Sequence, residues 1–90
     1  MQQKINLPNE LTLPFIREVY SDIHFQDGVE ACQLDFNLVE EIDSSGMQLM
    51  LLVMKKARSK NIELEFINVS QGIEHFLKQF QLSPEFEPLE

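Results

Sequence analysis

The sequence predicts an α/β fold in which a mostly parallel or mixed sheet of four to five strands carries three to four helices. In some segments apolar and polar residues alternate, as in strands, and in the segments between them apolar residues recur every three or four positions, as on one helix face. Such alternation of strands and helices along a chain builds parallel sheets with helices packed on them. Ninety residues suffice for one domain, and no internal repeat or linker divides them. We therefore expect a single domain over residues 1–90, with residues 84–90, which contain two prolines and three glutamates, as a flexible tail.

The first third contains two short extended pieces, residues 4–7 and residues 10–12, separated by a turn at Pro8 and Asn9. We expect them to form a small hairpin or an edge strand. Thr12 is suited to cap a first helix that has Pro14 near its start. The core-facing side of this helix is expected to hold Phe15, Ile16, Val19, Tyr20 and Ile23.

A strand is predicted over residues 29–36, with Cys32, Leu34 and Phe36 on one face and Asp35 on the other. Cys32 is the single cysteine, so it cannot form an internal disulfide, which fits a reducing compartment. Its expected role is that of a small buried hydrophobic residue.

The most apolar segment covers residues 47–54, in which Gln48 is the only polar residue. This is more than one core-facing stripe requires, so the helix is expected to be apolar on two sides. The face expected to cover the sheet holds Met47, Met50, Leu51, Met54 and Ala57. The second face is expected to remain available to a partner, a neighbouring helix or a second copy, and it holds Leu49, Leu52 and Val53. Basic residues gather at the C-terminal end of this helix, where they complement its dipole: Lys55, Lys56, Arg58 and Lys60.

The last third begins with a chain reversal at Asn61. A strand follows, because Ile62, Leu64 and Phe66 alternate with two glutamates. Ser70 is suited to cap a final helix. The apolar face of that helix is expected to hold Ile73, Phe76, Leu77 and Phe80.

Composition excludes several classes of function. The formal net charge of −8 disfavours binding to nucleic acid or to an anionic membrane, since both depend on clustered basic residues. No apolar run approaches the roughly 20 residues of a membrane-spanning helix, and the first ten residues lack the apolar core of a signal peptide. We expect a cytoplasmic protein that does not insert into a membrane.

The sequence contains no pattern that indicates catalysis. His24 and His75 are far apart and have no metal-ligand spacing, and Cys32 has no evident activating base. No Walker loop or dinucleotide fingerprint is present. We therefore expect a protein that is not an enzyme and that has no catalytic residues, no metal and no cofactor.

The tetrapeptide Asp43, Ser44, Ser45 and Gly46 lies between a strand-like run ending at Ile42 and the apolar helix. A helix N-terminus presents unpaired N–H groups and roughly half a positive charge, so it tolerates a phosphate on one hydroxyl. Capping alone explains one or two of these residues, and Ser45 with Gln48 has the spacing of a capping box. Gly46 is unfavourable inside a first turn, and we interpret it as a place where a partner backbone approaches closely.

The segment LDFNLVEEIDSSGMQLMLLVMKKARSKNIELEFINVS resembles the STAS domain, named for sulfate transporters and anti-sigma factor antagonists. The matching features are the strand ending at Leu34 and Asp35, the DSSG motif after Ile42, the apolar helix and the strand of residues 62–67. In bacterial anti-sigma factor antagonists, the first serine of this motif is phosphorylated by a partner that is both a kinase and an anti-sigma factor. The resemblance implies that Ser44, or alternatively Ser45, is the target, and that a serine phosphatase resets the protein.

The resemblance leaves two functions open. The first is an anti-sigma factor antagonist or a related partner-switching regulator. The second is the small STAS subunit that binds the ATPase of a phospholipid-transporting ABC complex. For either function, the residues expected to contact a partner are Asp43, Ser44, Ser45, Gly46, Gln48, Leu49, Leu52 and Val53.

Overall fold

The computed structural model describes residues 1–79, so Phe80 and the predicted tail of residues 84–90 lie outside the described part. The strands are β1 (Gln2–Asn6), β2 (Glu10–Leu11), β3 (Ala31–Asp35), β4 (Glu41–Ile42) and β5 (Glu63–Ile67). The helices are the 3-10 helix η1 (Leu13–Phe15), α1 (Ile16–Asp22), α2 (Ser44–Ser59) and α3 (Gln71–Gln79). The predicted order of elements is therefore confirmed over these residues.

The five strands form two sheets, and every pairing is parallel. One sheet has the order β1-β3-β5, and the other pairs β2 with β4. Of the two structures expected for the first two extended pieces, the hairpin is wrong, because β1 and β2 pair with different strands, whereas β1 is an edge strand of the larger sheet. The Asn9 carbonyl accepts hydrogen bonds from the N–H groups of Glu40 and Glu41, at 2.8 and 3.1 Å. These bonds hold the turn against the chain that follows β3, so β2 pairs there with β4.

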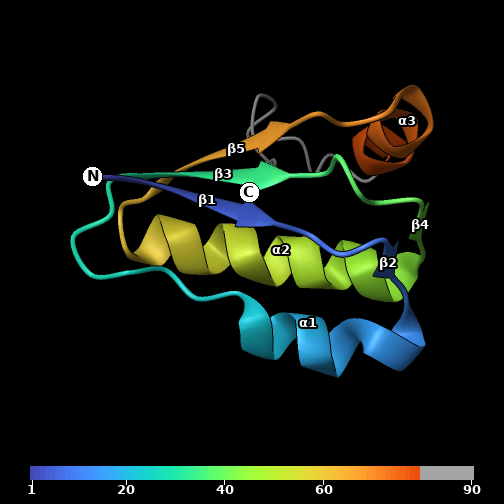
Figure 1. Ribbon diagram of the computed structural model, residues 1–90, viewed down its shortest axis with the longest axis horizontal. Coiled ribbons are helices and arrows are strands. Elements are labelled where there is room, and N and C mark those ends of the chain that lie inside the picture. Colours follow the sequence, from blue (N-terminus) through green and yellow to red (C-terminus); the bar gives the residue numbers. More distant parts are fainter. Residues whose placement is uncertain (80–90) are drawn as a thin grey trace.

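The helices lie on both sides of the larger sheet (Figure 1). α1 and α2 cover one face, whereas α3 lies on the other side, beyond the carboxyl ends of the strands. β2 and β4 pack against α2 near its first turn. The N-terminus of α2 thus lies against two strands from different parts of the chain.

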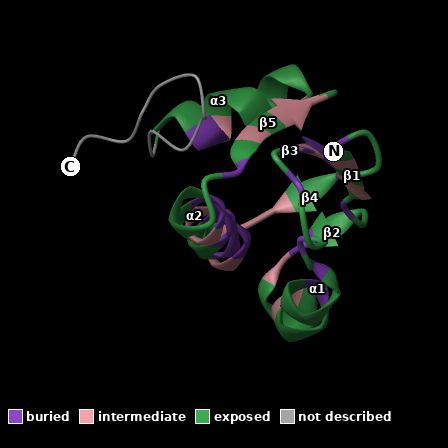
Figure 2. Ribbon diagram, turned by 90° about the vertical axis from the view of Figure 1, so that its left-hand side faces the viewer, coloured by how far each residue is buried: buried purple, intermediate pink, exposed green. Residues whose placement is uncertain are grey.

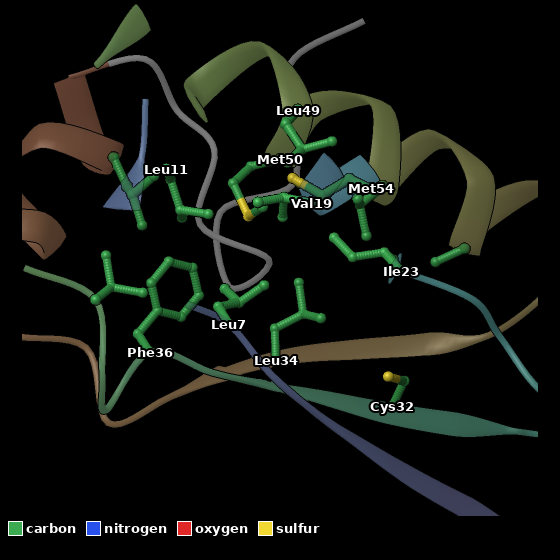
Figure 3. Packing of buried hydrophobic residues seen from close by; sticks show 14 of the residues in the cluster. Leu7, Leu11, Val19, Ile23, Cys32, Leu34, Phe36, Leu49, Met50 and Met54 are labelled. Atoms are coloured by element: carbon green, nitrogen blue, oxygen red, sulfur yellow. The ribbon is translucent and has the colours of Figure 1, made fainter. Parts of the chain in front are cut away.

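The core lies between the sheet and the two helices that cover it. Cys32, Leu34 and Phe36 point from β3 and its end toward α2, as predicted (Figure 3). Met50 and Met54 meet them from α2, so both methionines fill the core. Burial raises the pKa of the Cys32 thiol, which keeps it protonated and unreactive.

The start of the first helix differs from the prediction in two ways. Thr12 makes no capping hydrogen bond with its side chain, and its hydroxyl instead donates to Glu10 Oε1 at 3.4 Å. The predicted core face is also too wide, because Phe15 and Tyr20 are 42% and 51% exposed. α1 has only seven residues and lies at the outside of the molecule, so it buries only a narrow stripe around Val19.

Asp35, expected on the open side of β3, is only 6% exposed. Its Oδ1 accepts hydrogen bonds from Asn68 Nδ2 at 3.1 Å and from the Asn37 N–H at 2.8 Å. Its Oδ2 lies 3.2 Å from Lys4 Nζ. The bond from Asn68, then that from Asn37 and the nearby Lys4 charge lower the pKa of Asp35. This carboxylate therefore ties β1 to the carboxyl ends of β3 and β5.

A predicted chain reversal and a predicted helix cap in the last third of the chain are confirmed. Asn61 adopts a left-handed conformation with φ of 58° after α2. Ser70 Oγ accepts the N–H of Ile73 at 3.3 Å and so caps α3. Ile73 and Leu77 then face the core.

Candidate functional site

Asp43 connects β4 to α2 and caps the helix. Its Oδ1 accepts hydrogen bonds from the N–H groups of Ser45 and Gly46, at 2.9 and 3.1 Å. Because Asp43 is the N-cap, Ser45 lies inside the first turn and does not form a capping box with Gln48.

Asp43 also holds a second helix. Its Oδ2 accepts the N–H of Leu13 at 3.0 Å, so it satisfies the first N–H group of η1, which Thr12 was expected to cap. The bond from Leu13, followed by those from Gly46 and Ser45, lowers the pKa of Asp43. One ionised carboxylate therefore joins two helix starts that are 30 residues apart in the sequence.

Gly46 is buried against β2 rather than open to a partner. A Cβ atom at this position would lie 2.2 Å from the Leu11 carbonyl oxygen and 2.8 Å from Ile42 Cγ1. The same Leu11 oxygen accepts the Asp43 N–H at 3.2 Å. The interpretation that a partner backbone approaches Gly46 is therefore wrong, because the backbone that approaches is the protein's own.

The two serines differ in accessibility. Ser44 occupies the first position of α2 and is exposed, whereas Ser45 is half-buried. Both lie in the first turn, close to the half positive charge of the helix N-terminus. A modifying enzyme therefore has easier access to the Ser44 hydroxyl.

The predicted second face of α2 is only partly available. Leu49 and Val53 are 2% and 3% exposed and belong to the core, so the expectation that they remain open to a partner is wrong. α2 packs against both the sheet and α1, which makes its buried arc wider than one stripe (Figure 2). Leu52 remains 53% exposed and Gln48 is exposed.

The exposed residues of α2 are Ser44, Gln48, Leu52, Lys55, Arg58 and Ser59, and the first four of them form a line along the helix. Steps of three or four residues along α2 place side chains roughly above one another. The line begins at the DSSG motif and holds one large apolar side chain near its middle.

The surroundings of the first turn are acidic. Glu10 and Glu41 lie side by side in the β2-β4 pair, and both are exposed, as is Glu40. A shallow hollow of about 590 Å³ opens between this strand pair and α3. The residues that line the hollow are Thr12, Glu40, Glu41, Ile42, Asp43, Ser70, Gly72, Ile73 and Phe76.

Leu13 is a residue of this site that the sequence did not reveal. It is 70% exposed and lies beside Asp43 through its backbone bond. A leucine before a proline has no local pattern that marks it as exposed. Only the contact with Asp43 brings it next to the DSSG motif.

Within residues 1–79, no group of three or more His, Cys, Asp or Glu side chains could hold a metal ion. His24 follows α1, and His75 lies in α3 with its Nε2 3.2 Å from Gln79 Nε2. Among the described helices none is both long and apolar enough to cross a membrane. Around Ser44 the structure presents an exposed hydroxyl at the N-terminus of α2.

Comparison with protein families finds a match to the STAS domain over residues 10–90. Comparisons with curated proteins and with solved structures found no match. The family match covers β2 and every described element after it.

Proposed function

The chain belongs to the STAS domain family, and we propose that it is a partner-switching regulator controlled by phosphorylation of Ser44. A STAS domain supports a general regulatory role through protein binding. The proposed partner is a serine kinase that also acts as an anti-sigma factor, and a serine phosphatase reverses the modification. The protein itself has no catalytic role, needs no metal or cofactor, and works in the cytoplasm.

The accessibility of Ser44 supports this proposal most strongly. Its hydroxyl is exposed at the first position of α2, while its backbone is held by the helix and by the Asp43 cap. A kinase therefore meets a target in a fixed position at the edge of a binding surface. The half-buried Ser45 is the less accessible alternative.

A phosphate on Ser44 would change the surface rather than the fold. It would add about 1.5 to 2 negative charges beside Glu41 and Asp43. The N–H groups of Ser45 and Gly46 already bond to Asp43, so the phosphate would stay exposed to solvent. Burying such a dianion in a partner contact requires removing its water, which is costly. The phosphorylated protein would release its partner and remain folded.

The test is affinity purification of the tagged protein from its own cells at native abundance, followed by identification of the ATPase that binds it. Wild type is compared with Ser44→Asp, Ser44→Ala and Ser21→Asp. Ser21 is an exposed serine on α1, so Ser21→Asp adds the same charge away from the DSSG motif. We expect wild type, Ser44→Ala and Ser21→Asp to retain a soluble serine kinase and Ser44→Asp to lose it.

Binding of the purified kinase is then measured by calorimetry. Loss of one buried, well-packed contact typically costs tenfold or more in affinity, so Ser44→Asp should weaken binding by about tenfold or more. Equal affinity of Ser44→Asp and wild type would contradict the proposal. Recovery of a membrane transporter's ATPase instead of a kinase would support the alternative, a subunit of a phospholipid-transporting ABC complex.

A further inference from the structure

We draw no further inference here: the strongest candidate, the hollow of about 300 Å³ between the turn at Pro8 and Asn9 and helix α1, is a cluster of the acidic side chains Glu10, Glu18 and Asp22 around the exposed Phe15, and nothing in the described part of the chain shows what covers it.

Discussion

Replacement of Gly46 by alanine distinguishes a glycine required by the fold from one required by a partner. The added methyl group would lie 2.2 Å from the Leu11 carbonyl oxygen, 2.8 Å from Ile42 Cγ1 and 2.9 Å from Leu11 Cβ. Comfortable contacts of a carbon atom are roughly 3.5 Å or longer. β2 would therefore have to move away from α2 by about 1 Å.

The free-energy cost of that movement can be estimated from the contacts that Leu11 of β2 makes. The Leu11 oxygen accepts the Asp43 N–H at 3.2 Å, and Leu11 is fully buried. Overpacking of a core costs about 1–3 kcal/mol of folding free energy. We expect a cost near the upper end of this range, because the group in the way is a backbone carbonyl, which cannot rotate aside as a side chain can. Alanine recovers at most about 1 kcal/mol in helix propensity. We expect Gly46→Ala to lower the free energy of unfolding by about 2 kcal/mol, which corresponds to a decrease in Tm of about 8–16 °C.

The assay is thermal and urea unfolding followed by circular dichroism, with Gly72→Ala as the matched control. Gly72 lies in the first turn of α3, and a Cβ atom there would meet nothing within 4 Å. Gly72→Ala should therefore be neutral or stabilising by up to about 1 kcal/mol. If Gly46→Ala proved as stable as Gly72→Ala, the close approach of β2 to α2 would be refuted.

Two further predictions concern the same helix and its cap. In urea unfolding, Leu49→Ala should lower the free energy of unfolding by about 2–5 kcal/mol, because Leu49 is in the core. Leu52→Ala should stay within about 0.5 kcal/mol of wild type, because Leu52 is half-exposed. Similar losses for both variants would contradict the assignment of Leu49 to the buried face and Leu52 to the exposed face. The pKa values of Asp43 and Asp35 are lower in the folded state, so their stabilisation is present above about pH 4 and is lost as pH falls through the folded-state values. Asp43→Asn keeps a good N-cap but cannot titrate, so its unfolding free energy should fall less steeply than that of wild type between about pH 6 and about pH 3. An unchanged slope would show that the Asp43 carboxylate is not held in its ionised form.

Much of the candidate site could be predicted from the sequence because its chemistry is local. The position of the DSSG motif between a strand and an apolar helix predicts a helix start, and Asp43 is one of the three residues suited to cap it. The exposure of Ser44 and Gln48 also agrees with their place on the outside of α2. The role of Ser44 as a phosphorylation target stays a prediction.

Other features of the site could not be predicted because they join residues distant in the sequence. Asp43 bonds to Leu13 across 30 residues, and no local pattern marks that pair. A glycine at position 46 indicates that another backbone approaches closely, and we expected that backbone to belong to a partner. In the structure, the Leu11 backbone of the same chain lies against Gly46. An unusual residue in a motif can indicate a close contact, but only the three-dimensional structure identifies the residue that makes this contact.

The class of each element, the order of the elements and the family could be predicted from the amino-acid sequence, because periodicity and capping act within a few residues. The directions of the side chains around α2 could be predicted too, since they follow from about 100° per residue. Which of those directions are buried could not be predicted, because burial depends on where the neighbouring elements lie in the folded protein. The sheet and α1 together enclose Leu49 and Val53, and they leave Leu52 outside with Ser44 and Gln48.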